Sequence, residues 1–430
     1  MGWRARRAAR LRLPPVDGQH EDQLYFVPSF GRAHGGGAHL WPAGRRDEPP
    51  VSGPEFPAKL EGAMSGPVAI YIHVPFCPSK CGYCDFNSFA MTGPIQGETV
   101  DAMEHEIRTS PHAGRPAKTI FFGGGTPTYL EASQLARLLQ AVLDTHPAGA
   151  ETEITTESNP GTVTLEKLGA LRQAGFNRLS LGAQSFATQD LVQLGRVHGV
   201  AEIAEAVTAA RQAGFENLNL DLMFGLPGQN LARWRNNLDQ ALALHPDHLS
   251  LYGLTIEPNT RFFRYFQRGW LDLPAEDTMV AMYEEAVARM TAAGLEPYEI
   301  SNFARPGRRC QHNLAYWRAE EYIGYGPGAV GRIGTRRGTN LKHPARYVEA
   351  VRAGEPLWLE EEELSHDDLR LERIMLGIRI EEGLDLAAVP LSDTAIASVT
   401  EPGWATTEGD RLRLTPAGRH FASEVAVRLA

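Results

Sequence analysis

The chain has few cysteines, no long apolar run and no excess of basic residues. Its 430 residues are 43 % hydrophobic and 22 % charged, an ordinary composition for a globular protein. No apolar run reaches the roughly 20 residues that a membrane-spanning helix needs. A net charge of −10 argues against a general nucleic-acid binder, so we expect no nucleic-acid partner. The length allows one large α/β domain and a smaller one.

Three of the four cysteines lie together in one short loop. Cys77, Cys81 and Cys84 have the spacing C-x3-C-x2-C and follow the apolar run 69–74. This is no disulfide framework of a secreted protein, so we expect a reducing, cytoplasmic compartment. Three thiolates in one loop suit an iron–sulfur cube that leaves its fourth iron open, whereas a structural zinc ion would need a fourth protein ligand nearby.

Residues 1–63 differ from the rest of the chain. The segment begins with many arginines and then shows no helical or strand periodicity, and it lacks the apolar stretch of a signal peptide. It can be read as a disordered extension, as a transit peptide or basic arm, or as sequence upstream of a true start at Met64. We assign it no function.

From residue 68 onward, strands and helices are predicted to alternate. Short apolar runs predict buried parallel strands at 69–74, 119–122, 153–156, 178–181, 218–222 and 248–252. Amphipathic stretches predict helices at 99–109, 133–145, 165–174, 201–213 and 230–244. Six such units indicate a doubly wound sheet or a complete or partial TIM-type barrel, and in each of these a ligand binds at the carboxyl ends of the strands.

Unusual residues follow these strands directly. They are Cys77, the run Gly123–Gly125, Glu157, Gln184 and Asp221. A glycine run alone is more often a tight turn, and a single carboxylate often caps the next helix, but five such features in register indicate a ligand site. An open iron could be chelated by the amine and carboxylate of S-adenosylmethionine. Glu157 and Asp221 could then accept hydrogen bonds from its ribose or ammonium, and Arg196 could pair with its carboxylate.

Several motifs resemble one family, the radical S-adenosylmethionine (radical SAM) proteins of the oxygen-independent coproporphyrinogen III oxidase group. The motifs are YIHVPFC at 71–77, FFGGGTPT at 121–128, SLGAQSF at 180–186, LGRVH at 194–198 and DLMFGLPG at 221–228. The resemblance implies a partial (β/α)6 barrel at 64–300, a linking region at 301–365 and a winged-helix-like C-terminal domain at 366–430. It implies Cys77, Cys81 and Cys84 as ligands of a 4Fe-4S cluster. It also implies contacts to S-adenosylmethionine from Tyr71, Tyr83, Gly124, Gly125, Thr126, Glu157, Gln184, Arg196 and Asp221. Tyr83 could instead shield the cluster from solvent.

Two positions distinguish the branches of this family. True oxidases resemble C-x3-C-x2-C-x-C, but this chain has Phe86 where the further cysteine would stand. Cys-Asp-Phe at 84–86 and His-Asn-x-x-Tyr-Trp at 312–317 resemble the HemW branch of heme chaperones. That branch implies heme and an unidentified heme-acceptor protein as partners, and makes oxidase activity unlikely. A coproporphyrinogen III oxidase is the alternative, and a radical SAM methylase or cyclopropanase is a third. A homodimer and peripheral membrane contact stay open.

The second half of the chain holds the heme candidates. A helix over 274–294 has methionines that we interpret as core filler. The glycine- and aromatic-rich stretch 322–329 suits a flat apolar ligand, and His312 is the candidate heme ligand, with Cys310 second. Without the family resemblance, His312 would be read as part of a turn on an aromatic core. The candidates for the propionates are Arg332, Arg336 and Arg337.

The last segment reads as a small separate unit. The acidic run 360–363 is interpreted as a solvated linker. A helix at 369–377, a hairpin at 403–414 and a final helix ending at 429 predict a winged-helix-like module. Since the chain is acidic, we expect this module to be a lid or docking surface rather than a DNA reader.

Overall fold

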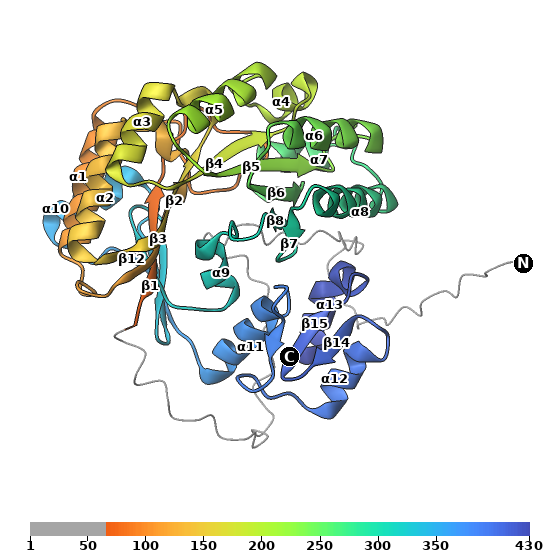
Figure 1. Ribbon diagram of the computed structural model, residues 1–430. Helices are drawn as coiled ribbons and strands as arrows, with labels where there is room; N and C mark the ends of the chain where they lie inside the picture. The colour runs from red at the N-terminus through yellow and green to blue at the C-terminus, as the bar shows by residue number, and fades with distance from the viewer. Residues whose placement is uncertain (1–65) are drawn as a thin grey trace, which may run out of the picture.

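One twelve-stranded sheet organises the computed structural model, which describes residues 66–430 (Figure 1). The strand order is β12-β11-β10-β9-β1-β2-β3-β4-β5-β6-β8-β7. Residues 1–63, predicted to be an extension or to precede the true start, lie outside the described residues. None of the helices described is long and apolar enough to cross a membrane.

Six parallel strands form the partial barrel. They are β1 (Val68–Val74), β2 (Ala117–Gly124), β3 (Ala148–Ser158), β4 (Arg178–Gln184), β5 (Asn217–Phe224) and β6 (His248–Gly253). The helices between them are α1 (Pro94–Arg108), α2 (Ala132–Thr145), α3 (Leu165–Ala174), α4 (Thr188–Leu194), α5 (Val200–Gln212) and α6 (Leu231–Ala243). These helices lie on the outer face of the curved sheet (Figure 1). The predicted partial barrel is therefore confirmed, and the doubly wound alternative, which needs helices on both faces, is excluded.

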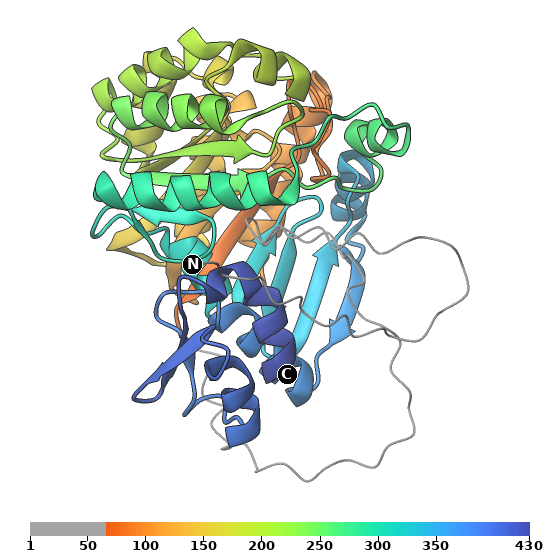
Figure 2. The ribbon, with the colours of Figure 1, turned by 90° about the vertical axis from the view of Figure 1, so that its right-hand side faces the viewer.

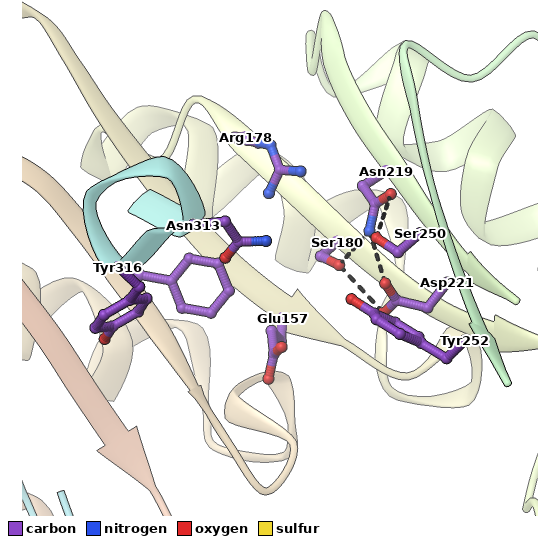
Figure 3. A pocket seen from close by; sticks show the side chains of 10 residues that line it. Glu157, Arg178, Ser180, Asn219, Asp221, Ser250, Tyr252, Asn313 and Tyr316 are labelled. Atoms are coloured by element: carbon purple, nitrogen blue, oxygen red, sulfur yellow. Dashed lines mark hydrogen bonds between the residues drawn. The ribbon is translucent and has the colours of Figure 1, made fainter. Parts of the chain in front are cut away.

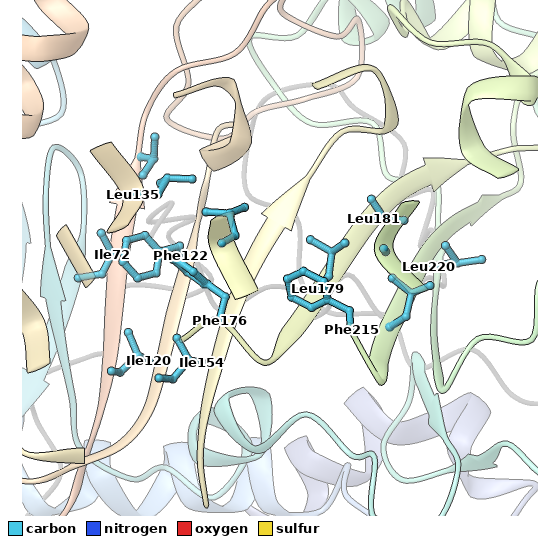
Figure 4. Close-up of a cluster of buried hydrophobic side chains, with 14 of the residues drawn as sticks. Ile72, Ile120, Phe122, Leu135, Ile154, Phe176, Leu179, Leu181, Phe215 and Leu220 are labelled. Carbon is cyan, nitrogen blue, oxygen red and sulfur yellow. The ribbon is translucent and has the colours of Figure 1, made fainter. Parts of the chain in front are cut away.

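The strands alternate between an apolar outer face and a polar inner face. Ile120 and Phe122 of β2, Leu179 of β4 and Leu220 of β5 pack with Phe176 between the sheet and the outer helices (Figure 4). The residues between them in sequence point into the barrel. They include Thr119, Arg178, Ser180, Asn219, Asp221 and Ser250, all of which are also buried. Burial of the apolar set stabilises the barrel, while the polar set lines its interior.

The segment predicted to be a linking region adds strands to this sheet. β9 (Tyr322–Tyr325) pairs in parallel with β1, and β10 (Val330–Ile333), β11 (Arg336–Asn340) and β12 (Trp358–Glu363) continue the sheet antiparallel (Figure 2, cyan to light blue). The run 360–363 is solvated, as predicted, but the interpretation of it as a linker is wrong. These glutamates are exposed, but they form the edge strand because they face the arginines of β11: Arg337 pairs with Glu362 at 2.8 Å.

At the other edge, β6 pairs with β8 (Asn302–Ala304), which pairs with β7 (Glu296–Pro297). The preceding helix α8 (Glu276–Ala292) buries Met282, Ala286 and Met290, so the prediction of methionines as core filler is confirmed. Three further helices of the described chain are α7 (Arg261–Gln267), α9 (Gln311–Trp317) and α10 (Pro344–Ala353). Of these, α9 lies on the inner side of the curved sheet (Figure 1).

The C-terminal module has its own core. It consists of α11 (His366–Gly377), β13 (Leu384–Asp385), α12 (Asp393–Thr400), β14 (Ala405–Glu408), β15 (Arg411–Leu414) and α13 (Ala422–Leu429). Its strands form a small antiparallel sheet, and Ile374, Val399, Leu412 and Val425 are fully buried between sheet and helices. The predicted combination of helices and a hairpin is confirmed.

Replacing Phe122 with alanine tests the outer core. Its ring is fully buried and meets Phe176 edge to face at 5.1 Å between centroids. The cavity left by Phe122→Ala should lower the free energy of unfolding by about 3–5 kcal/mol. Urea denaturation followed by circular dichroism measures this loss. Val192→Ala, at a side chain that is 73 % exposed, is the control and should change stability by less than about 0.5 kcal/mol.

Candidate metal and cofactor site

The cysteine loop begins where β1 ends. β1 is buried along its whole length because it lies between β2 and β9. Beyond it the chain makes a closed loop: the amide of Cys77 donates to the carbonyl of Phe89 (3.0 Å), and the amide of Phe89 donates to that of Pro75 (2.7 Å). The loop is also tied to its surroundings, since Gly82 donates to the carbonyl of Leu194 (3.1 Å). The three cysteines are thus presented at the carboxyl end of the sheet.

A buried histidine holds the far side of this loop. His73 Nε2 lies 2.8 Å from the carbonyl oxygen of Asn87, which can only accept, so Nε2 carries the proton and donates. Burial lowers the pKa of His73 to about 4, and the ring is therefore neutral near pH 7. In the neutral ring Nδ1 is an acceptor, and it accepts from the Tyr71 hydroxyl at 3.1 Å. The Asn87 side chain in turn donates to the carbonyls of Pro327 (3.0 Å) and Lys342 (2.9 Å).

All three loop cysteines are free thiols and partly exposed. Burial raises the pKa of Cys77, and it raises that of Cys84 to about 11, so metal binding must displace their protons. Residues outside the loop supply donors to the sulfurs: Thr126 Oγ1 lies 3.5 Å from Cys77 Sγ, and Arg196 Nη1 lies 3.6 Å from Cys81 Sγ. Such donors stabilise thiolates and bound sulfide.

The donor set fits an iron–sulfur cube better than a single ion. Within residues 66–430, no three His, Cys, Asp or Glu side chains converge closely enough to hold one metal ion. In a cube each thiolate binds its own iron, so the three sulfurs stand apart instead of meeting at one point. The three-cysteine loop is compatible with that arrangement.

The glycine run closes β2 against the start of the loop. Gly124 has a φ of +103°, which favours glycine, and a Cβ on Gly125 would lie 2.5 Å from the carbonyl oxygen of Phe76. The amide of Gly125 donates to Val74 (2.8 Å), and that of Thr126 donates to Phe76 (2.7 Å). The conformation of the glycine run is therefore fixed by close contacts within the chain.

The other predicted contacts gather around the same end of the barrel. Glu157, Gln184 and Asp221 stand at or near the ends of the adjacent strands β3, β4 and β5. The backbone of Gln184 has a φ of 64°, in the left-handed region, which is a strained conformation for a residue other than glycine. Arg196 Nη2 donates to the carbonyl of Gly182 at 2.8 Å, which fixes the guanidinium beside Cys81.

Tyr83, in the cysteine loop, packs against the helix α7. Its ring meets that of Phe262 in α7 edge to face, at 6.3 Å between centroids. Tyr83 also packs against the small apolar cluster that includes Leu194 and Leu254. This placement is that expected of an aromatic that shields the cysteine loop.

A cavity with many polar lining residues lies inside the barrel, beside Glu157 and Asp221 (Figure 3). Its lining residues are Phe121, Glu157, Arg178, Ser180, Asn219, Asp221, Ser250, Tyr252, Asn313 and Tyr316. Asn219 donates to both Ser180 Oγ and Asp221 Oδ1 at 2.8 Å. Arg178 is only 2 % exposed, and its Nε has no hydrogen-bond partner in the described structure.

Most of this lining was not predicted from the sequence. Arg178, Asn219, Ser250 and Tyr252 were read only as parts of apolar strands. The available signal was the alternation Arg-Leu-Ser-Leu at 178–181 and Asn-Leu-Asn-Leu-Asp-Leu at 217–222, in which every second residue of a buried strand is polar. A buried strand that alternates in this way faces an apolar layer on one side and a polar site on the other.

The candidate heme ligand His312 lies inside the barrel. It is 1 % exposed and stacks on Phe121 with ring centroids 4.9 Å apart. Both ring nitrogens are engaged: Nδ1 with Thr119 Oγ1 at 2.8 Å and Nε2 with the Tyr316 hydroxyl at 3.1 Å. Burial lowers the pKa of His312 to about 3. In this arrangement neither nitrogen is open to iron, and ligation would require α9 to move.

The second ligand candidate is equally enclosed. Cys310 is fully buried just before α9, and its Sγ lies 3.5 Å from Glu153 Oε1. The same carboxylate accepts from the amides of Gln311 (3.0 Å) and His312 (3.1 Å), which satisfies the first turn of the helix. Burial raises the pKa of Cys310 to about 12, so this thiol stays protonated. The Cys310–Trp317 motif therefore anchors α9 in the barrel.

The remaining heme candidates also have partners within the chain. Arg332 donates to the backbone carbonyls of Ala319 and Glu320, whereas Arg336 and Arg337 pair with glutamates of β12. The stretch 322–329 was expected to leave room for a flat ligand. That expectation is wrong for its glycines, because Gly324 and Gly328 have no room for a side chain against Val330 and Asn87.

Comparisons with known proteins identify the class. Residues 71–241 match the Radical SAM superfamily, and residues 364–421 match the HemN C-terminal domain. A solved structure of coproporphyrinogen III oxidase (HemN) from Escherichia coli superposes with a TM-score of 0.74 at 26 % identity, covering 86 % of this chain and 92 % of that one. The fold and the cysteine loop are thus those of a radical SAM protein, which implies a 4Fe-4S cluster and S-adenosylmethionine.

Curated relatives narrow the class to one family. The chain is 39 % identical to the heme chaperone HemW of Mycobacterium tuberculosis (strain ATCC 25618 / H37Rv) over 382 residues, 86 % of this chain and 97 % of that protein. It is 40 % identical to the heme chaperone HemW of Bacillus subtilis (strain 168) over 73 % of this chain and 84 % of that protein. This chain belongs to the HemW family.

The buried His312 predicts a specific pH dependence of stability. Its pKa is about 3 in the folded protein and about 6.5 in the unfolded chain, so only the unfolded chain takes up this proton between these values. Stability should therefore fall as the pH falls below about 6.5, by up to about 1.4 kcal/mol per pH unit for this group. Urea denaturation between pH 7 and 5 should show that the free energy of unfolding falls less steeply with pH in His312→Gln than in the wild type. His105→Gln, at an exposed residue of α1, is the control. If the free energy of unfolding fell as steeply with pH in His312→Gln as in the wild type, His312 would not be the group that titrates.

Proposed function

We propose that this protein is a cytoplasmic heme chaperone, which binds heme and transfers it to an acceptor protein. The observation that carries the proposal is the similarity to proteins named heme chaperone HemW, which extends over 97 % of the length of one of them. The similarity includes the barrel and the C-terminal module, so it does not rest on one shared domain.

The same proposal assigns the cofactor residues. Cys77, Cys81 and Cys84 would hold the 4Fe-4S cluster, and S-adenosylmethionine would bind beside it. When bound, these two groups supply one-electron chemistry. The chain would position them: Arg196 stands beside Cys81, and the strand-end carboxylates Glu157 and Asp221 line the cavity inside the barrel. Other contacts to S-adenosylmethionine come from Tyr71, Tyr83, Gly124, Gly125, Thr126 and Gln184.

The alternative function is oxygen-independent oxidation of coproporphyrinogen III. The likeness to the HemN structure favours it, because the barrel and the C-terminal module are shared. Position 86 argues against it. Oxidases of this group resemble a pattern with a further cysteine there, whereas this chain has Phe86, whose carbonyl accepts from Lys80 Nζ at 2.5 Å. The backbone at this position closes the loop, and its side chain cannot bind iron.

Cysteine substitutions test the cluster assignment. Replacing Cys77, Cys81 or Cys84 with alanine removes one of three ligands, so anaerobic reconstitution with iron and sulfide should lose most of the brown 4Fe-4S absorbance. Cys310→Ala is the matched control and should retain the absorbance, since this thiol is enclosed beside Glu153. Loss of the cluster in Cys310→Ala would disprove the three-ligand assignment.

Two assays separate chaperone from oxidase. Titration of the reconstituted protein with hemin should shift the Soret band, and anaerobic incubation with coproporphyrinogen III, S-adenosylmethionine and a reductant should yield no protoporphyrinogen. A vinyl product would establish the oxidase, and a hemin titration without any shift would rule out the chaperone. His312→Ala belongs in the same titration, because a weaker shift would show that α9 opens to let His312 reach the iron.

A further inference from the structure

The short helix α7 covers the cysteine loop with one face. Thr260 caps its start, where its hydroxyl accepts from the amide of Phe263 at 3.0 Å. Phe262 is 1 % exposed, its amide donates to the carbonyl of Gly82 (2.9 Å), and its ring meets Tyr83. The inner face of α7 is therefore fixed to the loop that carries Cys81 and Cys84.

The outer face of α7 carries a row of arginines. Arg261 and Arg264 lie one turn apart on the helix, Arg268 follows directly after its last residue, Gln267, and all three are exposed. Trp270 follows with 64 % of its surface exposed, and the Arg268 guanidinium lies 4.8 Å from the centre of its ring. We call these four residues the arginine–tryptophan face.

The arginines of this face form no ion pairs, unlike several other exposed arginines of the described chain. Within residues 66–430, no ion pair joins any of its three arginines to a carboxylate, whereas Arg235 pairs with Glu285 (2.9 Å) and Arg346 pairs with Glu349 (3.0 Å). The chain as a whole has a net charge of −10, so an exposed cationic row is a local exception.

Acidic residues flank the helix on both sides in the sequence, with Glu257 before it and the exposed Asp272 after Trp270. Glu257 precedes the Thr260 cap, and its pKa is raised by partial burial and by the nearby Asp85.

We propose that the arginine–tryptophan face is the entry site for heme, with the porphyrin plane on Trp270 and the propionates on Arg264 and Arg268. This inference rests on the proposed function. Heme combines a large apolar plane with two carboxylates, and an exposed indole beside a guanidinium group, with a further exposed arginine one turn away, matches both parts. In the segment 261–270, Tyr265 is the one side chain with heme-ligating chemistry, and its ring lies 5.8 Å from that of Trp270.

The position of the face supports this assignment over the barrel interior. His312, Cys310 and the arginines of β10 and β11 all have partners within the chain, and the cavity beside Asn313 and Tyr316 is enclosed by α9. The arginine–tryptophan face needs no rearrangement to bind. The helix that carries it packs on the cysteine loop with its other face, through Phe262.

Hemin titration of the cluster-reconstituted full-length protein tests this site. The double substitution R264Q/R268Q should weaken hemin binding at least about tenfold, because charge-assisted pairs with the propionates are lost. W270A should weaken it by a similar factor. The matched control is R346Q/R352Q, which removes two exposed arginines of α10 and should leave the affinity unchanged. The absorbance of the cluster should be the same in all variants, which shows that the loop stays folded.

A second ligand isolates the role of the carboxylates. Hemin dimethyl ester lacks the propionate charges, so it should bind the wild type and R264Q/R268Q with equal affinity. If hemin itself bound both proteins equally, the proposed site would be wrong while the chaperone function stood. If the wild type bound no hemin, both would be wrong.

Vesicles of phosphatidylglycerol separate heme from an anionic membrane, which could use the same arginines. Cosedimentation that is lost in R264Q/R268Q, together with unchanged hemin affinity, would assign the face to lipid and overturn the proposal. Reduced hemin affinity with no vesicle binding in the wild type would support it.

Discussion

The hydrogen bond from His73 to the carbonyl of Asn87 is the contact on which the cysteine loop depends. It joins β1, which is buried along its whole length, to the far end of the loop. Burial keeps the imidazole neutral, with its N–H proton on Nε2, so the ring can donate to the carbonyl. The side chain of Asn87 in turn donates hydrogen bonds to the carbonyls of residues 327 and 342. The position of the cysteines is therefore determined by parts of the chain more than 200 residues apart.

A second constraint is the polarity of the barrel interior. The outer face of each parallel strand is apolar and packs on helices, so the strands are held without help from the inner face. The inner face is thus free to carry Arg178, Asn219 and Asp221 beneath the candidate cofactor site. The helix α9 closes this space, since Glu153 satisfies its first amides and His312 bonds to β2. The motif that resembles a heme site is, in this arrangement, the inner wall of the barrel.

Much of the fold could be predicted because its patterns are local. The six strands and the helices between them depend on periodicity, and the predicted helix 165–174 ends where Gly175 has a φ of +115°. The linker interpretation of 360–363 failed because four successive glutamates have no strand pattern of their own, and the arginines that hold them belong to another strand. The glycines at 324 and 328 were misread for a similar reason, since their close neighbours are distant in sequence.

The sequence by itself determined the class of cofactor chemistry. The C-x3-C-x2-C spacing indicates the cluster, and the residues after each strand can be placed together because parallel strands end at one edge of the sheet. The tertiary structure decided which polar side chains remain available. It engaged both nitrogens of His312, paired Arg337 with Glu362 and left Arg264 and Arg268 exposed beside Trp270. These outcomes depend on desolvation and on partners brought together by the sheet. Neither can be read from the spacing of residues along the chain.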